Sequence, residues 1–290
     1  VAEASGKLSE PDRTVRERAW RAIAKASSNI AKECDEIFLK LLTLRRQLAH
    51  NAGFADYRAY RWQELERFDY APEDALEFVA SIEKEVVPLV TKIWEKRKQK
   101  LSVDTLRPWD LEVDPDSRPA LKPAKTTKEL EDGLERMFTN LDPALGQQFA
   151  SMRNGWLELE PRPGKVANVG YCSYFPLSKM PYIFYSLFGT YTDVWVLLHE
   201  MGHAFHDFAM GASQPLIWDK HWTSSEFAEV GSQTMELLAL PQLEKEQGGF
   251  FSEEDARRAR ENQLLHVIML FGVARGEAFQ HWLYTEAPED

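Results

Sequence analysis

Cysteine is nearly absent from this sequence, and so are long apolar runs. The only two cysteines, Cys34 and Cys172, show no framework spacing, which excludes a disulfide-stapled secreted domain and predicts two buried, unpaired thiols in a reducing, cytoplasmic compartment. No apolar run reaches the ~18–20 residues of a membrane span, and the longest, Val194–Leu198, stops at a histidine. The first residues have neither the basic nor the apolar segment of a signal peptide. We therefore expect no membrane partner.

Basic residues are also in short supply. Lys and Arg number 35 against 46 Asp and Glu, which gives a formal net charge of -11. Nucleic-acid binding requires basic patches on the surface, so nucleic acid is not expected as a partner. Hydrophobic residues make up 44% and charged residues 28% of the 290 residues, a globular balance that suits one large domain or two modest ones.

Apolar residues recur at helical spacing through most of the chain. Long helices are expected from Ser9–Pro11 to about Asn51, and from Pro72 to about Leu101 with a kink at Pro88. Shorter helices are expected at 57–68, 127–138 and 143–152. Near 156–160, 171–175 and 182–186 the pattern changes to alternating or aromatic segments, which predict three short strands. The fold class is therefore mainly α, with a small antiparallel β-sheet just before residues 194–210. We expect an N-terminal helical region, 1–122, and a second region, 123–290.

Residues 194–210, VWVLLHEMGHAFHDFAM, carry charged groups on an otherwise apolar helix. His199 and His203 are four residues apart and therefore lie one above the other on the same helical face, where two imidazoles can bind one metal ion. H-E-x-x-H on a helix is the zinc-peptidase pattern, with Glu200 as general base. The alternative is a hydrogen-bonded polar cluster without a metal. Buried His and Glu side chains need bonding partners, however, and one metal ion would supply a partner to all of them. We predict one Zn²⁺ per chain.

A catalytic zinc site needs a third protein ligand. The metzincin pattern is excluded because positions 206 and 209 are His and Ala. Three acids on the next predicted helix, 223–236, compete for the role: Glu226, Glu229 and Glu236. Thr223-x-x-Glu226 forms a capping box, which gives Glu226 a structural task, so Glu229 is favoured and Glu226 stays the alternative. Glu236 and Gln233 are candidates to hold a ligand histidine from behind.

Two further histidines near the motif have less certain tasks. His206 could orient the site or simply pack, and His221 could reach the cleft or cap the following helix. Asp207 could pair with a neighbouring base or cap a polar patch. His50, His266 and His281 stand in separate helical contexts and are expected to be structural.

The combination H199-E-M-G-H-A-F-H206 and F227-A-E-V-G-S-Q-T-M-E236 resembles the thimet-oligopeptidase-like metallopeptidases, most closely the oligoendopeptidase F branch. The segments starting at Gly170 and Pro181 resemble it too. The resemblance implies a large helical zincin-type fold with a deep channel for short unstructured peptides. It also implies zinc held by His199, His203 and Glu229, with Glu200 as base. The strand at 182–185 is then our candidate for the channel wall, with Tyr182 contacting substrate.

The resemblance also raises the question of completeness. Both ends of the sequence look cut, and the family's oxyanion-stabilising Tyr and His residues lie further along than Asp290. We expect a piece of a longer chain that binds zinc and is a weak catalyst alone. Two rival readings are a non-catalytic zinc- and peptide-binding fragment, and a thermolysin-like or aminopeptidase enzyme with the same kind of zinc site.

Overall fold

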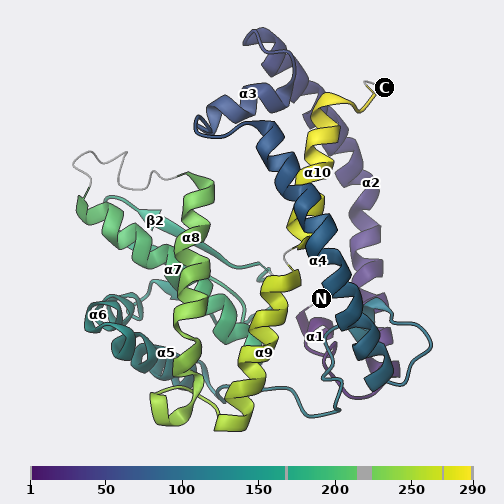
Figure 1. Cartoon of the computed structure of the whole chain (residues 1–290). Coiled ribbons are helices and arrows are strands. Elements are labelled where there is room, and N and C mark those ends of the chain that lie inside the picture. Colours follow the sequence, from purple (N-terminus) through teal and green to yellow (C-terminus); the bar gives the residue numbers. More distant parts are fainter. Residues whose placement is uncertain (1, 167–168, 214–223, 270, 289–290) are drawn as a thin grey trace. The chain divides into compact units, whose positions relative to one another are not determined.

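The computed structural model describes residues 2–166, 169–213, 224–269 and 271–288. The chain divides into two compact units, which are described separately: Glu3–Arg118 with Leu264–Asp290, and Pro119–Gln263. Figure 1 shows the helices and strands, with the helices and strand β2 labelled. No helix in the described part of the chain is both long enough and apolar enough to cross a membrane.

The first unit is built from long helices. They are α2 (Arg13–Asn51), α3 (Tyr57–Glu64), α4 (Pro72–Lys100) and α10 (Phe271–Thr285), with a short α1 (Ala2–Ser5) and the 3-10 turn η1 (Pro108–Asp110). The long helix expected near residues 9–51 is confirmed, but its N-cap is Asp12, whose carboxylate accepts the N–H groups of Thr14 and Val15. The helix around Pro88 is also confirmed, and α4 continues through that proline.

Helix α10 packs with the N-terminal helices, although the sequence analysis groups it with the region 123–290. The ring of Tyr284 lies 4.9 Å from that of Tyr57, and Phe271 lies 6.2 Å from Trp94. His281 is 5% exposed and receives a hydrogen bond of 3.1 Å from Arg58. The last helix thus belongs structurally to the first unit.

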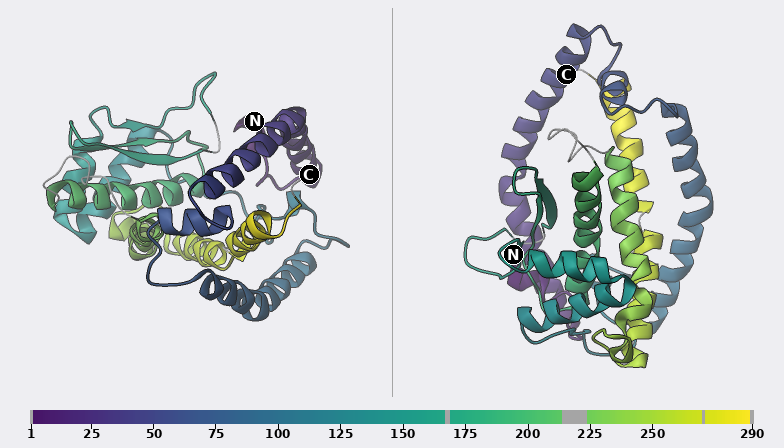
Figure 2. Two further views of the ribbon diagram at one scale, coloured as in Figure 1. Left: turned by 90° about the horizontal axis from the view of Figure 1, so that it is seen from above. Right: turned by 90° about the vertical axis from the view of Figure 1, so that its left-hand side faces the viewer.

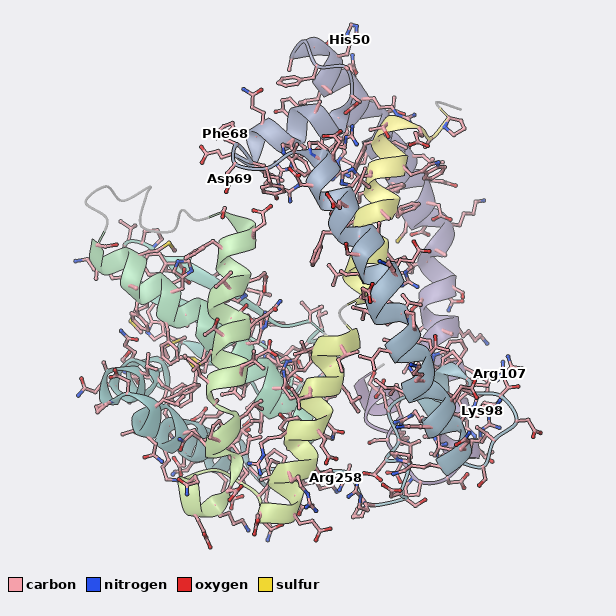
Figure 3. The ribbon with its side chains drawn as sticks, in the orientation of Figure 1. His50, Phe68, Asp69, Lys98, Arg107 and Arg258 are labelled. Atoms are coloured by element: carbon pink, nitrogen blue, oxygen red, sulfur yellow. The ribbon has the colours of Figure 1, made fainter. Side chains whose placement is uncertain are left out.

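The second unit combines helices with one small sheet. Its helices are α5 (Thr127–Leu141), α6 (Pro143–Met152), α7 (Tyr191–Ser213), α8 (Ser225–Leu238) and α9 (Glu253–Met269), the last of which continues beyond the unit, with the 3-10 turns η3 (Leu240–Leu243) and η4 (Lys245–Gln247). Arg258 on α9, labelled in Figure 3, donates to the carbonyl of Pro119 at 2.6 Å. This bond fastens α9 to the first residue of the unit.

Three short strands, β1 (Leu157–Glu158), β2 (Tyr171–Phe175) and β3 (Met180–Phe184), form the sheet in the order β1-β3-β2. The predicted small sheet is confirmed, but only the β2–β3 pair is antiparallel, and β1 runs parallel to β3. Alternation along a strand shows which side chains share a face and carries no information on pairing direction, so this part of the prediction is wrong. In this sheet β2 is an edge strand.

The core of the second unit surrounds α7. Leu197, Leu198 and Met201 are at most 1% exposed, and Phe205 packs edge-on against Phe138 with ring centroids 5.0 Å apart. Ile183 of the central strand is fully buried in the same cluster. Figure 2 shows the sheet beside α7 in two further views. The motif helix is therefore fixed by apolar contacts with the sheet and with α5, α6 and α8.

The two thiols differ from the prediction in one respect. Cys172 is half-buried on β2, whereas Cys34 is exposed on α2. The expectation of two buried thiols is therefore wrong for Cys34. Neither cysteine forms a disulfide.

Candidate metal centre

The start of α7 is fixed by a buried carboxylate. Asp193 is 1% exposed and accepts the backbone N–H groups of Phe188 and Gly189, at 2.9 and 2.6 Å, and the hydroxyl of Tyr185 at 3.1 Å. Asp193 acts from within the first helical turn, which begins at Tyr191. The bonds set the direction in which α7 leaves the sheet and hence where its histidines lie.

His199 and His203 lie one helical turn apart, with ring centroids 4.9 Å apart and ring planes at 85°. The Nε2 atoms of both rings face Glu229 on α8: His199 Nε2 is 3.4 Å from Glu229 Oε2, and His203 Nε2 is 3.8 Å from Oε1. One ligand atom from each of the three residues lies within 4.8 Å of the others. The structure thus brings together the two histidines and the acid that the sequence analysis favoured.

Each histidine ring also makes a hydrogen bond to a group other than Glu229. His199 Nδ1 lies 2.7 Å from Glu236 Oε1, and the ring of His203 hydrogen-bonds a backbone group of Ala228. Burial lowers the pKa of His199, but the bond to Glu236 and the nearby charges of Glu200 and Glu229 raise it overall. Burial lowers the pKa of His203. A ring held at Nδ1 presents the lone pair of Nε2 to a metal ion, so the donor set fits a divalent cation such as zinc.

Glu236 orients the ring of His199. It is 5% exposed, and besides His199 it accepts hydrogen bonds from Trp195 Nε1, at 2.6 Å, and from the side-chain amide of Gln263 on α9. The structure thus places Glu236 against His199, the kind of contact proposed for it. Sequence reasoning missed Gln263 because nothing in the spacing of α9 links it to the motif.

Glu200 lies beside the cluster, 6% exposed, with its carboxylate hydrogen-bonded by the backbone N–H of Cys172. Burial, helped by the charge of Glu229 and opposed by that of His199, raises its pKa to about 7. A Cβ at Gly170 would lie 3.2 Å from Glu200 Oε1. A side chain at residue 170 would therefore press on this carboxylate, and glycine avoids that contact.

Glu229 is positioned by the crossing of α7 and α8. A Cβ at Gly202 would lie 2.5 Å from the Cα of Ser232 and 2.7 Å from the carbonyl oxygen of Gly231, so the two backbones touch where the motif has its glycine. Ser232 also donates its hydroxyl to Glu229 Oε2 at 2.8 Å. The small residues in both motif helices were a visible signal for this crossing, and the sequence analysis did not use it.

The cluster opens into a cleft of about 590 Å³, lined by residues 170–174, His199, Glu200, His203, Asp207, Ala228 and Glu229. Strand β2 forms one wall of this cleft. Among the described strands, β2 pairs only with β3, on one of its two edges. Tyr182 instead lies in the central strand β3, outside the cleft lining, with its ring edge-on to Phe175. The expectation that 182–185 forms the channel wall is wrong, because alternation does not reveal strand order in a sheet.

The remaining candidates that the structure describes are not among the three residues that converge as a metal cluster. Glu226 is exposed in the first turn of α8 and is not part of it, and Gln233 is exposed outside the cleft lining. The N-cap of α8 is Ser224, and the predicted cap Thr223 lies outside the described residues. His206 packs against the ring of Phe227, with centroids 5.7 Å apart. His221 also lies outside the described residues.

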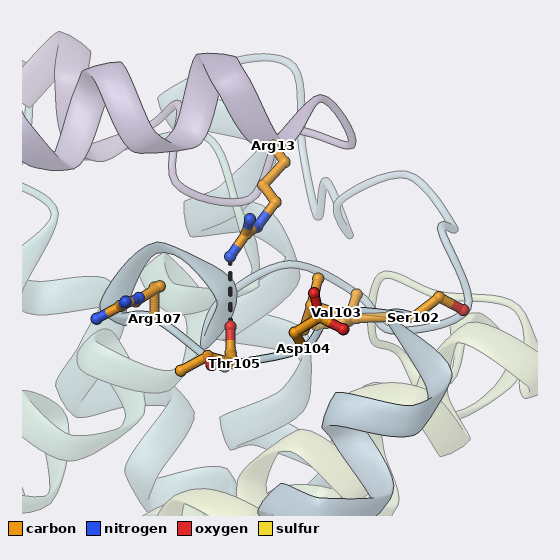
Figure 4. Close-up of a pocket in the computed structure, with 7 residues that line it drawn as sticks. Arg13, Ser102, Val103, Asp104, Thr105 and Arg107 are labelled. Atoms are coloured by element: carbon orange, nitrogen blue, oxygen red, sulfur yellow. Dashed lines mark hydrogen bonds between the residues drawn. The ribbon is translucent and has the colours of Figure 1, made fainter.

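The first unit has a pocket of its own, of about 540 Å³, lined by Leu101–Thr105, Arg13 and Arg107 (Figure 4). Arg13 reaches the carbonyl of Thr105 at 3.4 Å and is also bound by Asp110 at 2.8 Å. No histidine or cysteine is among the residues that line this pocket. Its chemistry therefore gives no reason to assign it a reaction.

Comparisons with known proteins agree with the geometry. The model of peptidase family M3 matches residues 7–290. Oligopeptidase PepF of Bacillus subtilis is 26% identical over 225 residues, which is 75% of this chain and 32% of that protein.

Solved structures match over nearly the whole chain. A protein designated oligoendopeptidase F has a TM-score of 0.89 at 28% identity, over 98% of this chain and 49% of its own. PZ peptidase A, solved with an inhibitor, has a TM-score of 0.85 at 29% identity, again over 98% and 49%. The chain thus spans a third of the curated relative and about half of the solved structures.

Proposed function

Because this chain belongs to peptidase family M3, we propose that it carries the zinc site of a metalloendopeptidase that cleaves internal bonds of short, unstructured oligopeptides. One observation carries the proposal. Two imidazole Nε2 atoms and a carboxylate converge within 4.8 Å, and a buried carboxylate, Glu200, lies in the same cleft. A purely structural zinc site has no need of that additional acid.

His199, His203 and Glu229 would hold the ion, with the fourth position open toward the cleft. The chemistry that zinc supplies in such a site is Lewis acidity toward a peptide carbonyl and a water molecule. Glu236, Trp195 and Gln263 fix the orientation of the His199 ring, and Ser232 fixes the Glu229 carboxylate. These supporting contacts keep the three donor atoms facing one point.

Glu200 is assigned the role of general base. It would take a proton from the attacking water and pass it to the departing amine nitrogen. Its carboxylate is aimed by the Cys172 N–H, and the bare backbone at Gly170 lets that strand pass close. The pKa of about 7 that burial gives this carboxyl suits a group that must both accept and return a proton near neutral pH.

The edge strand β2 is the proposed binding site for the peptide backbone. It forms one wall of the cleft, and its edge away from β3, apart from the Cys172 N–H that binds Glu200, offers backbone groups that an extended peptide can pair with. This mode selects unstructured peptides, because only an extended chain can add a strand. The unpaired, exposed Cys34 supports our further proposal of a reducing, cytoplasmic location.

A second candidate is a zinc- and peptide-binding chain that is catalytically incomplete on its own. The observation that favours it is the matched length, about half of the solved structures. The family match favours both candidates over a thermolysin-like or aminopeptidase enzyme.

The deciding experiment measures zinc per chain by elemental analysis together with cleavage of a quenched fluorescent peptide, with and without a chelator. One zinc with chelator-sensitive cleavage supports the peptidase, and one zinc without cleavage supports the incomplete form. Glu200→Gln should abolish turnover and keep the zinc, whereas His199→Ala should lose it. Unchanged zinc content in His199→Ala would refute the site.

A further inference from the structure

The cleft contains a carboxylate that the proposed reaction does not use. Its lining holds three acids, Glu200, Glu229 and Asp207, and no lysine or arginine is among the described residues that line it. Glu200 is assigned as base and Glu229 as metal ligand. Asp207 has neither task, yet it lies half-buried on the same helix.

Asp207 continues the face of α7 that carries the site. It is four residues after His203 and seven after Glu200, so it lies about 6 and about 10 Å further along the helix axis at 1.5 Å per residue. An extended peptide advances about 3.3 Å per residue. A side chain about two to three residues from the cleaved bond would therefore come level with Asp207.

The edge strand β2 lies over this carboxylate. Cys172 Sγ is 3.6 Å from Asp207 Oδ2, and the hydroxyl of Tyr174 lies so close to α7 that a Cβ at Gly211 would be 2.1 Å from it. Cys172 and Tyr174 both line the cleft, as does Asp207. A peptide paired with β2 would thus pass directly beside Asp207.

Within the described part of the chain, the hydrogen bond that Asp207 makes to Cys172 does not balance its charge. A thiol is a weak, neutral hydrogen-bond donor. Burial, together with the charges of Asp207 and Glu200, raises the pKa of the Cys172 thiol, so it stays protonated. A half-buried carboxylate with such a partner gains most from a cationic group, which forms a shorter and stronger charge-assisted bond.

We propose that Asp207, flanked by Cys172 and Tyr174, is a specificity-determining residue that recognises a cationic group of the bound peptide, a Lys or Arg side chain or a free N-terminal ammonium. The inference rests on the proposed peptidase function and adds the substrate class to it. Cationic peptides are bound more tightly than neutral ones of the same shape.

The test measures binding, with cleavage switched off by Glu200→Gln in the zinc-loaded chain. The probes are fluorescently labelled acetylated peptides in which one lysine is moved through every position, each matched by a peptide with norleucine there. One lysine-free peptide has a free N-terminus. Burial raises the pKa of Asp207 to about 6, so binding is measured at about pH 8, where the carboxylate is ionised.

We expect lysine at one position, or the free N-terminus, to bind about tenfold more tightly than its neutral match. The peptide that binds more tightly than its neutral match shows whether the recognised cation is a lysine side chain or the N-terminal ammonium. Asp207→Asn should abolish the difference while leaving the norleucine peptides bound, and Asp207→Glu should retain part of it. Glu261→Gln, which removes one exposed negative charge from α9, should leave the ratio unchanged.

Three results would overturn the inference. Equal affinities for lysine and norleucine at every position, with the free N-terminus no tighter, would leave Asp207 as a structural partner of Cys172. A lysine preference that survives in Asp207→Asn would place the recognition elsewhere. If no peptide binds at all, the proposed peptidase function fails as well, so the two failures are distinguishable.

Discussion

Helices α2 and α7 are both long, but they are stabilised in different ways. Of the 39 residues of α2, four are buried, whereas ten of the 23 residues of α7 are buried. Ile37, Leu39 and Leu44 of α2 are each more than 60% exposed, and the leucines and methionines of α7 lie in the core. The helix that carries the proposed metal ligands is the one that is more extensively buried.

The start of α2 is instead held by polar contacts. Asp110, fully buried, receives bonds from Arg13 at 2.8 Å and from Arg16 at 3.2 Å, and Arg16 also donates to the carbonyl of Trp109 at 2.8 Å. Such contacts fix one end of a helix, while close packing along its whole length fixes the direction of every side chain. Only the second arrangement can hold three ligands to within a fraction of an ångström.

The largest difference between the helices should appear on truncating one leucine in each. Leu197→Ala removes a side chain that is 1% exposed and should lower the free energy of unfolding by about 2–5 kcal/mol. Leu44→Ala, 61% exposed, should change it by at most about 0.5 kcal/mol. Urea denaturation measures both. If both variants lose a similar free energy of unfolding, Leu44 is buried in solution and the proposed difference between α2 and α7 is wrong.

The glycine at the α7–α8 crossing gives the next largest effect. Gly202→Ala forces a methyl group into the backbone of α8 and should destabilise the second unit by about 1–3 kcal/mol. It should also weaken zinc binding, because α8 carries Glu229. Thermal unfolding and zinc competition with a chromophoric chelator report the two effects.

Gly231→Ala is the matched control on the facing helix. A Cβ there would lie 3.5 Å from the Gly202 carbonyl and 3.6 Å from the Cβ of His206, which are ordinary contacts. Since alanine favours a helix over glycine by up to about 1 kcal/mol, this variant should be neutral or slightly more stable. If both alanine variants lose the same stability, the close crossing of α7 and α8 cannot be the reason for the glycine at position 202.

A smaller effect, on zinc affinity, is expected from the residue that orients His199. Glu236→Gln keeps the shape but loses the charge that holds His199 Nδ1, and should weaken zinc binding by about 10–100-fold. Gln233→Ala, one turn earlier and exposed, should leave the zinc affinity unchanged. The same chelator competition measures both variants, and equal zinc affinities in the two would remove Glu236 from the site.

These two positions illustrate what the sequence can decide. From Glu229, position 236 is seven residues on and returns to within about 20° of the same face, while position 233 is about 40° away on the other side. Helical periodicity thus favours Glu236 over Gln233, and it equally predicts that His199 and His203 share one helical face. Such relations depend only on the local geometry of one helix.

The sequence could not predict relations between elements. Gln263 reaches Glu236 from a helix 27 residues later, and β2 lines the cleft instead of the strand of Tyr182 because of strand order. The wall could be anticipated only with the sheet topology known, since alternation is the same in an edge and a central strand. Cys34 was misjudged for a similar reason: the burial of a helical face depends on what packs against it.

The smallest expected effect concerns the polar contacts that hold the start of α2, and it is tested by the pH dependence of stability. Burial alone would raise the pKa of Asp110, but its bonds to Arg13, the Arg107 N–H and Arg16 lower it below its ordinary value. A carboxyl with a lowered folded-state pKa contributes stability that is present above its unfolded pKa of about 4 and lost as the pH falls through the folded value. Asp110→Asn should therefore cost about 1 kcal/mol at neutral pH and progressively less below about pH 4. A penalty that stays constant through this range would mean that packing, not charge, anchors α2 at Asp110.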